Sequence, residues 1–427
     1  MMSDKHIADA HLRDHAAHFE KQIYRVADKI HVAVGFAASN VAMIEAENSL
    51  IIIDTTESTA AAEAILERFR AISDKPISTI IYTHSHRDHI GGASIFAAEG
   101  VKAIYASQNF NSDLVDAART GTLPTASLMA RTKAQFGIGL NPEQRVHLGL
   151  GPGDRPLKGL GQGFVPPTIN FADAAQDLEI DGVKMHVFPA PGETPDHVNI
   201  WLDDIKLLFC GDNFYHAFPN LYAIRGTAYR DFDSWANTLD MLLEHKAEIL
   251  VSGHGQPVIG AANISERLTD YRDAIRAVIE QAVKGMNAGL AFEVIAAEAQ
   301  LPAYLAEKPW LVEHYGSFSY AVKACCVGLM GWYSGNVEEL LIRQPAKQAA
   351  DWLALIGGAD AVMPAVNAAF EAQNYALVLE LCKIAQRADY QNDDMDKVRR
   401  ATLIALAETT YNAPTRNSLF SAAMDLE

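Results

Sequence analysis

Three histidines and one aspartate occur within the hexapeptide HSHRDH, which follows the strand-like run ISTIIYT. Because successive side chains of a strand point to opposite faces, His84 and His86 share one face where this strand ends. Asp88 and His89 fall on the turn that leads into the next helix, where their side chains could bind a second metal ion nearby. Two adjacent pairs of nitrogen and oxygen ligands suit two metal ions that lie about 3.5–4 Å apart and share a bridging hydroxide. Polar residues that only cap a helix would account for Asp88 but not for three histidines.

Four side chains cannot complete two metal coordination shells, so further ligands are expected downstream. The candidates are Glu193 in PAPGETPDH, Asp212 in FCGDNFY and His254 in VSGHG, each after a predicted strand and beside a glycine. We therefore expect them at the same end of one sheet. The assignment is His84, His86 and Glu193 for one ion, Asp88, His89 and His254 for the other, and Asp212 as the bridge. Imidazole and carboxylate ligands without thiolate favour two zinc ions over manganese or iron.

Three further polar residues lie near these candidates in the sequence. Asp54 ends the run LIIIDTT, and it would either orient a ligand from behind or cap a turn. His197 and His216 are close in sequence to the expected ligands, and we expect them to orient ligands or to line the site.

The elements that must position these side chains are short runs rich in valine and isoleucine: HVAVGFA, VAMIEA, LIIIDTT, ISTIIYT, VKMHVFPA, KLLFCGD and EILVSGH. Residues 59–72 show helical spacing between the third and fourth of these runs. Strands in hairpin-like order mixed with helices predict a layered sheet-and-helix fold of the α+β class. Residues 149–167 are rich in glycine and proline, and they form either an ordinary surface loop or a cover for the active site.

The second part of the chain is predicted to be helical. Strand-like runs almost vanish after about residue 262, and residues 358–408 predict three antiparallel helices. We therefore expect a catalytic domain at 17–262 and an all-helical domain at 263–427. The surplus of apolar helical faces favours a homodimer, while folding of these helices over the metal domain would use the same faces. Met330 and the pair Trp332–Tyr333 are expected in the core.

The composition excludes several classes of function. The chain has 427 residues, and 35 lysines and arginines against 53 aspartates and glutamates give a net charge of −18. This balance argues against binding to nucleic acid or to an anionic membrane. The N-terminus lacks the apolar segment of a signal peptide, and no apolar run reaches the ~18 residues of a membrane span. With four cysteines, too few for a disulfide framework, we expect a soluble, cytoplasmic protein.

The HSHRDH cluster resembles that of the metallo-β-lactamase superfamily. That superfamily usually has Gly-His-Thr where this chain has Gly192, Glu193 and Thr194, and the carboxylate at this position is similar to the alkylsulfatase branch. DNFYHAFPNLYAIRGTAYRD resembles the sulfate-binding segment of that branch, GWYSGNVEEL its GWY-D/S-GN turn, and GGADAVMPAVNAAFEAQNYALVLELCKIAQRADYQNDD its dimerisation domain. The resemblance covers roughly residues 17–427 and implies an αβ/βα sandwich followed by an all-α dimerisation domain.

The chain departs from the pattern of that branch at two positions of the sulfate-binding segment. The branch often has glutamate where Asp212 stands and a second histidine where Pro219 stands. It also often carries an export signal and a sterol-carrier-like C-terminal domain. We expect neither here, which argues against long-chain detergents as preferred substrates.

Charge counting favours a monoanionic substrate. Two divalent ions would contribute a formal charge of about +4, against about −3 from Asp88, Glu193 and Asp212, so a bridging hydroxide leaves the centre near neutral. Such a centre gains little from polarising a highly charged group. A sulfate ester fits if separate polar groups hold the sulfate.

Three residues are candidates for holding that sulfate. The resemblance assigns Asn220 and Arg225 to it. Arg230 is our own weaker inference, because the planar guanidinium matches tetrahedral oxyanions; a surface salt bridge with Asp231 or Asp233 is the alternative.

The predicted function is a dinuclear zinc hydrolase that cleaves alkyl sulfate esters to inorganic sulfate and alcohol by attack of a metal-bound hydroxide. Asp88 and Asp212 are the metal ligands to which we give a catalytic role. Another hydrolase on the same scaffold, a lactonase, thioesterase or phosphodiesterase, is the first alternative, since fold does not fix chemistry. The second is a metal-stabilised dimeric scaffold without turnover. The expected partners are a small sulfate ester and a second copy of the chain.

Overall fold

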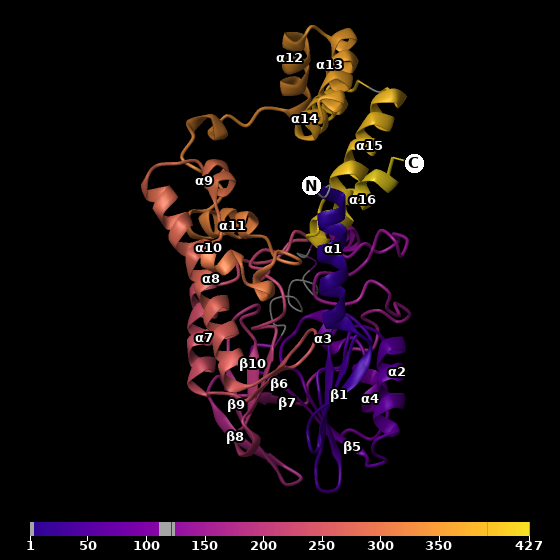
Figure 1. Ribbon diagram of the computed structural model, residues 1–427, viewed down its shortest axis with the longest axis vertical. Helices are drawn as coiled ribbons and strands as arrows, with labels where there is room; N and C mark the ends of the chain where they lie inside the picture. Colours follow the sequence, from indigo (N-terminus) through magenta and orange to yellow (C-terminus); the bar gives the residue numbers. More distant parts are fainter. Residues whose placement is uncertain (1–3, 111–120, 122–123, 391, 427) are drawn as a thin grey trace.

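The computed structural model describes residues 4–110, 121, 124–390 and 392–426. Its first part consists of two facing sheets with helices outside each of them (Figure 1). Within the described residues the first sheet has seven strands, in spatial order β1 Gln22–Ala27, β2 Ile30–Val34, β3 Val41–Glu45, β4 Leu50–Ile53, β5 Ile77–Ile81, β6 Ala103–Ser107 and β7 Ile169–Phe171. The second has six, in order β13 Val258–Ile259, β12 Ile249–Ser252, β11 Leu207–Gly211, β10 Val198–Leu202, β9 Val183–Pro189 and β8 Gln176–Ile180.

Two parallel strand pairs bring distant polar residues to one edge. Strands β4 and β5 run parallel with Ile53 opposite Ile81, so the segments that follow both strands leave the first sheet at the same edge. Strands β11 and β12 also run parallel, with Gly211 opposite Ser252. The N–H of Val198, at the start of β10, donates to the Thr83 carbonyl at 2.8 Å and joins the two sheets there. This edge therefore collects the ends of four strands.

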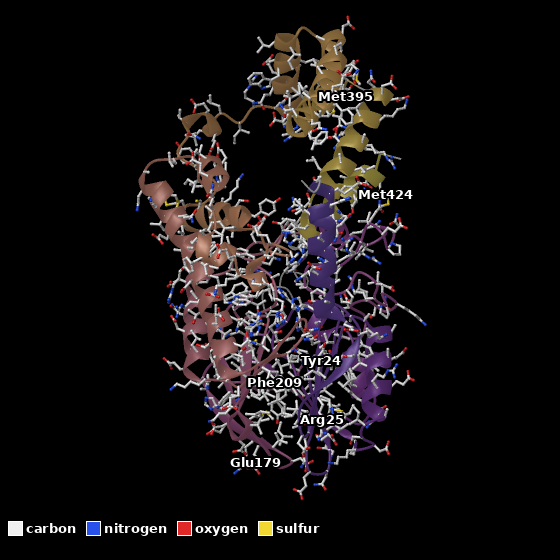
Figure 2. The ribbon with its side chains drawn as sticks, viewed as in Figure 1. Tyr24, Arg25, Glu179, Phe209, Met395 and Met424 are labelled. Atoms are coloured by element: carbon white, nitrogen blue, oxygen red, sulfur yellow. The ribbon has the colours of Figure 1, made fainter. Side chains whose placement is uncertain are left out.

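The layers are held together by three apolar clusters. Side chains of both sheets, including Val32, Ile200 and Phe209, fill the space between them, and Figure 2 shows Phe209 and Tyr24 in this interior. The outer face of the first sheet packs on α2 Thr59–Arg70 and α4 Ala93–Ala97. The outer face of the second packs on α7 Phe232–Glu244 and α8 Ala261–Asn287. The result is the predicted αβ/βα sandwich.

The second part is helical, and its first helices pack on α8: α9 Phe292–Glu298, α10 Ala303–Ala306 and α11 Phe318–Met330. A long segment then leads to α12 Pro345–Ile356, α13 Ala359–Glu371 and α14 Tyr375–Arg387, which stand apart from the sandwich in Figure 1. Helices α15 Asp393–Glu408 and α16 Ala413–Met424 return to it, and α16 packs on α6 Thr125–Gln135. The three helices predicted at 358–408 are confirmed as α13, α14 and α15.

The N-terminal helix α1 Asp4–Ala16 lies beside this returning pair (Figure 1). Lys5 pairs with Glu408 at 2.7 Å, and the His11 ring stacks on Tyr411. The sequence analysis did not predict this helix.

Met330, Trp332 and Tyr333 were expected in the core, but all three are exposed, Trp332 by 64%. The glycine-rich segment 149–167 contains no helix or strand and packs along α2 and α4, where the Gly163 N–H donates to the Gly91 carbonyl at 2.9 Å.

Among the described residues no single helix is long and apolar enough to span a membrane, although α12 and α13 together meet those criteria across a 79° bend.

Candidate metal centre

Two groups of ligand-type side chains converge at the edge where β5, β11 and β12 end. They are His84, His86 and Asp212 in one group and Asp88, His89 and His254 in the other, and in each group the ligand atoms lie within 4.8 Å of one another. Asp212 belongs to the first group and also lies next to the histidines of the second. Its Oδ2 is 3.1 Å from His254 Nε2, 3.3 Å from His89 Nε2 and 3.6 Å from His84 Nε2. The two groups could therefore hold metal ions side by side, and Asp212 contacts histidines of both.

Glu193 lies beside these groups, in the turn after β9. It is buried, and its Oε1 accepts a hydrogen bond from Arg230 Nη1, which also donates to the Asn220 carbonyl. Arg230 is only 5% exposed, so the alternative of a surface salt bridge is wrong. The structure thus makes Arg230 the partner of an expected metal ligand.

Several polar atoms of these side chains are buried without a hydrogen bond. His84 Nε2, His89 Nε2, Glu193 Oε2 and Asp212 Oδ1 have no hydrogen-bond partner within the part of the chain that the structure describes. An unsatisfied buried polar atom costs about 1–3 kcal/mol, and more when it is charged. Because these orphan atoms belong to one cluster of imidazoles and carboxylates, the donor set fits divalent cations.

The protonation states point the same way. Burial lowers the pKa of His84 and of His86 well below the usual value, so both rings are neutral and able to bind a metal. Burial opposes the charge of Asp212, but His254 and His89 hold its pKa well below the usual range. Burial raises the pKa of Glu193, and the Asp212 carboxylate beside it adds to the rise against the opposing charge of Arg230. Two buried carboxylates side by side favour a bound cation.

The surroundings fix which nitrogen each imidazole presents. His89 Nδ1 donates to Asp54 Oδ2 at 2.8 Å, and His254 Nδ1 donates to the Ala38 carbonyl at 2.8 Å. His84 Nδ1 lies 3.0 Å from the Thr83 hydroxyl, which itself donates to Asp54 Oδ2. In each case Nδ1 is engaged by the protein, and Nε2 faces the carboxylates of the cluster. Asp54 therefore contacts a candidate ligand directly, and its backbone adopts a left-handed φ of 57° at the end of β4.

Two further contacts hold Asp212 in place. His197 Nε2 accepts the backbone N–H of Asp212 at 3.0 Å, as expected for a residue that orients a ligand. Gly253 packs so closely that a Cβ there would lie 2.1 Å from Asp212 Oδ1 and 2.7 Å from His89 Cε1. Only glycine leaves room for both ligands.

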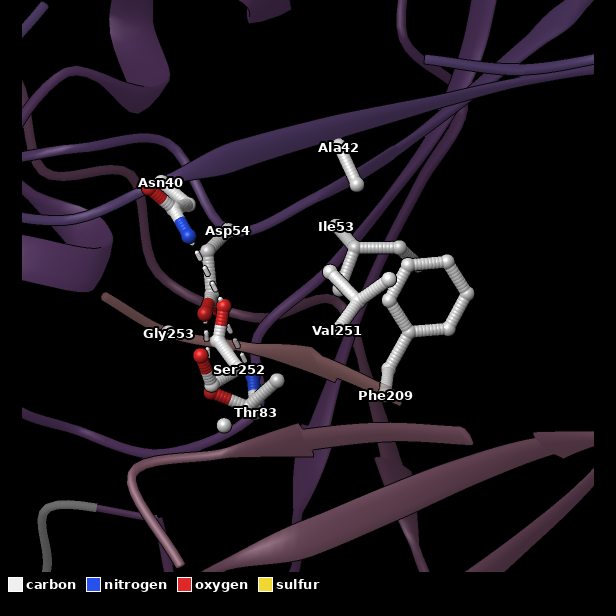
Figure 3. A pocket seen from close by; sticks show the side chains of 10 residues that line it. Asn40, Ala42, Ile53, Asp54, Thr83, Phe209, Val251, Ser252 and Gly253 are labelled. Atoms are coloured by element: carbon white, nitrogen blue, oxygen red, sulfur yellow. Dashed lines mark hydrogen bonds between the residues drawn. The ribbon is translucent and has the colours of Figure 1, made fainter. Parts of the chain in front are cut away.

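A small pocket lies behind the ligands, between the two sheets (Figure 3). Its polar side includes Asn40, Asp54 and Thr83, and the apolar side chains of Ala42 and Phe209 line the opposite part. Asn40 Nδ2 donates to the carbonyls of Ser252 at 3.0 Å and of Gly255 at 2.8 Å, which fixes the turn that carries His254. The sequence analysis missed Asn40, because an asparagine between two strands reads as an ordinary turn residue.

The chain matches two family models in sequence. Residues 34–254 match the metallo-beta-lactamase superfamily, and residues 292–427 match the alkyl sulfatase dimerisation family. A linear primary-alkylsulfatase of Pseudomonas sp. (strain ATCC 19151) is 34% identical over 392 residues, which cover 90% of this chain and 73% of that protein. The chain belongs to the alkylsulfatase branch of the metallo-β-lactamase superfamily. The resemblance stated from the sequence motifs is therefore confirmed.

Other members of the alkylsulfatase branch extend the similarity over almost the whole chain. An alkyl/aryl-sulfatase of Saccharomyces cerevisiae is 30% identical, covering 95% of this chain and 64% of that protein. An (R)-specific secondary-alkylsulfatase of Pseudomonas sp. is 29% identical, covering 95% of this chain and 62% of that protein. The solved structure of a stereoselective inverting sec-alkylsulfatase from Pseudomonas sp. superposes with a TM-score of 0.85 at 28% identity, covering 95% of this chain and 65% of that one.

Polar residues of segment 212–231, which resembles the sulfate-binding segment of the alkylsulfatase branch, lie next to the ligand cluster. The positive charges of Arg230 and Arg225 contribute to the lowered pKa of His86, after burial. Asn220 is buried, and its Nδ2 has no partner among the residues that the structure describes. Its backbone N–H donates to the Tyr215 hydroxyl at 2.6 Å.

The helical part adds a residue that the sequence analysis missed. Tyr315 precedes α11, and burial together with the charge of Glu193 raises the pKa of its phenol, while Arg225 opposes that rise. Its ring packs edge-on against that of Tyr215, with centroids 5.8 Å apart, and so joins the helical part to residues 212–231. No local pattern in the sequence distinguishes Tyr315 from a packing tyrosine, because the contact joins the two parts of the chain.

Proposed function

We propose that this protein hydrolyses alkyl sulfate esters to inorganic sulfate and an alcohol, with two zinc ions at the candidate metal centre. The observation that carries the proposal is a set of unsatisfied donors beside the ligand cluster. Asn220 Nδ2 and Arg230 Nε are buried and lack partners among the described residues, and Arg230 also contacts Glu193. Buried donors of this kind fit an anion such as sulfate.

We assign His84, His86 and Glu193 to one ion, Asp88, His89 and His254 to the other, and Asp212 to both. In support, Asp212 groups with His84 and His86, and its Oδ2 is 3.1 Å from His254 Nε2. Two zinc ions held there would supply Lewis acidity and lower the pKa of a water near them to about 7. Neutral imidazoles with carboxylates and no thiolate are the donors that support zinc. The Asp88 side chain is 28% exposed, so the centre is open to substrate on this side.

The surrounding side chains would bind and orient the ester. Arg225 and the Asn220 amide would hold the sulfate oxygens, and negative charge that builds on the departing sulfate would strengthen the contact with Arg225 in the transition state. Arg230 keeps the Glu193 carboxylate in place through their ion pair. Asp88 and Asp212 would act from the metal side, as ligands that face the reacting group.

The test is sulfate release from octyl sulfate by protein whose zinc content has been measured. We expect release at two zinc ions per chain, loss with a chelator, and recovery when zinc is added back. Two bound zinc ions with no sulfate release would overturn the proposal. Turnover of a lactone, thioester or phosphodiester in the same assay would then identify the hydrolase.

We also propose that the protein is a homodimer. The segment between α11 and α12 stretches away from the sandwich in Figure 1, and large apolar side chains are exposed along it and on α12, with Ile342 91% exposed. Leu341 and Leu355 are exposed in the same region, which lies inside the match to the alkyl sulfatase dimerisation family. Apolar surface of this extent is usually covered by a partner.

Sedimentation velocity tests this second proposal. We expect a dimer for the wild-type chain and a shift toward monomer for Ile342→Glu, since a charge in a buried interface is costly. Ile259→Glu, at another exposed isoleucine at the end of β13, is the matched control and should remain dimeric. A monomeric wild-type chain would contradict the proposal.

A further inference from the structure

Helix α6 packs one face against the segment that carries Arg225. Leu128, Arg131 and Gln135 are spaced three and four residues apart and so share a face of the helix. A Cβ at Gly226 would lie 3.9 Å from both Leu128 Cδ1 and Arg131 Nη1. Gln135 Oε1 accepts the backbone N–H of Arg225 at 2.9 Å. This helix is therefore a wall of the sulfate-binding segment.

Gln135 has an environment that packing alone does not explain. Its side chain is buried, with 1% exposed, and its Nε2 has no partner in the described part of the chain. An unpaired buried amide costs free energy that an apolar side chain of similar volume would not. Among the described residues, the side-chain amide of Gln135 makes a single hydrogen bond, in which its Oε1 accepts the Arg225 N–H.

The backbone at Arg225 controls the direction of its guanidinium. Arg225 Nη1 donates to the carbonyl of the next residue, Gly226, at 3.1 Å. The side chain is thus folded back on its own backbone. A hydrogen bond that fixes the Arg225 N–H therefore also fixes where the guanidinium lies.

A second contact ties this arrangement to the C-terminal helix. Asn417 on α16 is buried, and its Nδ2 donates to the Gln135 carbonyl at 3.1 Å. Asn417 Cγ also lies 3.1 Å from the place where Gly137 would carry a Cβ, so α16 closely abuts the end of α6. Since α16 lies within the region that matches the dimerisation family, the helical part of the chain supports the sulfate-binding segment through α6.

We propose that Gln135 is a positioning residue that holds Arg225 for sulfate binding, and that Asn417 anchors Gln135 to α16. This inference rests on the proposed alkylsulfatase function. Gln135 acts through Arg225, so its contribution should vanish when the Arg225 side chain is removed.

The test is a double-mutant cycle with octyl sulfate and zinc-loaded, full-length protein. Gln135→Met keeps the volume and removes the acceptor, and it should lower kcat/KM about tenfold, the worth of one to two kcal/mol of hydrogen bonding. In an Arg225→Ala background the same substitution should change kcat/KM by less than about twofold, because coupled residues are not additive. Zinc content should not change in either background.

Gln281→Met is the matched control, because Gln281 Oε1 likewise accepts a backbone N–H, that of Gln300, within the helical part. It should leave kcat/KM unchanged. A tenfold loss from Gln135→Met in both backgrounds would show a general structural role and overturn the inference. If Gln135→Met does not fold, Asn417→Ala takes its place in the cycle, with an expected loss of about threefold. Zinc-loaded wild-type protein that releases no sulfate would instead overturn the proposed function itself, and this inference with it.

Discussion

Among the residues that the structure describes, histidine rings gather in two clusters, and of these two only the candidate metal centre also contains carboxylates. The other, which we call the stacked cluster, joins the N-terminal segment to the sandwich and consists of His15, His18, His147, His216 and His314. The rings of His15 and His314 stack with centroids 3.9 Å apart, and those of His18 and His216 stack at 4.4 Å. Histidine content alone therefore does not identify a metal site.

The charges around the two clusters differ in sign. Burial lowers the pKa of His216 and of His314 to about 3, and neighbouring histidines reinforce that effect. At the metal centre burial also disfavours the charged ring, but Asp212 and Asp88 raise the pKa of His89 well above its usual value. The candidate metal centre contains carboxylates, whose negative charge would offset that of bound cations. In the stacked cluster the neighbouring ionisable groups include other imidazoles.

The nitrogens of the stacked cluster are used to hold loops. His15 Nε2 donates to the Gly149 carbonyl at 2.7 Å, and His147 Nδ1 accepts the Gly149 N–H at 2.9 Å. His216 Nε2 donates to the Gln256 carbonyl at 2.7 Å, a contact with backbone and not with a candidate metal ligand. Convergence of free ligand atoms on carboxylates, rather than ring contact, marks the metal site.

Removing the shared carboxylate should have the largest effect. Asp212→Ala should abolish binding of both zinc ions and lower turnover of octyl sulfate by about 10³ or more, the scale seen when a charged group of an active site is removed. His314→Phe, in the stacked cluster, should retain two zinc ions and nearly full activity. The zinc content of the two purified proteins is measured. Equal zinc content in both would refute the assignment of the metal site to the cluster around Asp212.

Weakening the support of a ligand should have an intermediate effect. Asp54→Asn keeps the shape but removes the charge that faces His89, so zinc affinity should fall about 10–100-fold, as for other residues that orient metal ligands. Competition with a zinc-binding dye measures this change. Glu45→Gln provides the control, because Glu45 contacts a different buried histidine, His31, at 3.0 Å. Equal affinities for the Asp54→Asn and Glu45→Gln proteins would show that Asp54 only caps a turn.

Acid should reveal the stacked cluster through a smaller effect. Since the folded pKa of His314 is about 3, the unfolded chain alone takes up a proton as the pH falls below about 6.5. The stability due to neutral His314 is thus present above pH ~6.5 and is lost as the pH falls toward the folded pKa, by about 1.4 kcal/mol per pH unit. In His314→Phe that contribution to the slope should be absent. Urea unfolding of both proteins between pH 6.5 and 5.5 measures it, and identical slopes would contradict the account.

Local patterns in the sequence predicted that these histidines and carboxylates meet at one edge of the sheets. The ligands lie at strand ends, and the registers of β4 with β5 and of β11 with β12 bring those ends together, so period-two strands and adjacent glycines were sufficient. The pairing of Arg230 with Glu193 was not foreseen, because it joins two turns that are distant in the sequence. Tyr315 and Asn40 were missed for the same reason. The roles given to individual site residues remain predictions that the experiments above test.

The exposed apolar residues show a second limit of sequence reasoning. Met330 and Trp332 were expected in the core because they are large and apolar. A run of large apolar side chains favours burial, but the sequence does not say whether they are buried in the core of the same chain or in an interface with another copy. The stacked cluster was also not predicted, since its five rings come from four separate segments of the chain.

Anomalous diffraction at the zinc absorption edge, from crystals grown with zinc, tests the central claim most directly. The account predicts two peaks about 3.5–4 Å apart on either side of Asp212, the spacing of paired catalytic ions, and no peak among the stacked histidines. Zinc bound in the stacked cluster, or no pair of peaks beside Asp212, would contradict it.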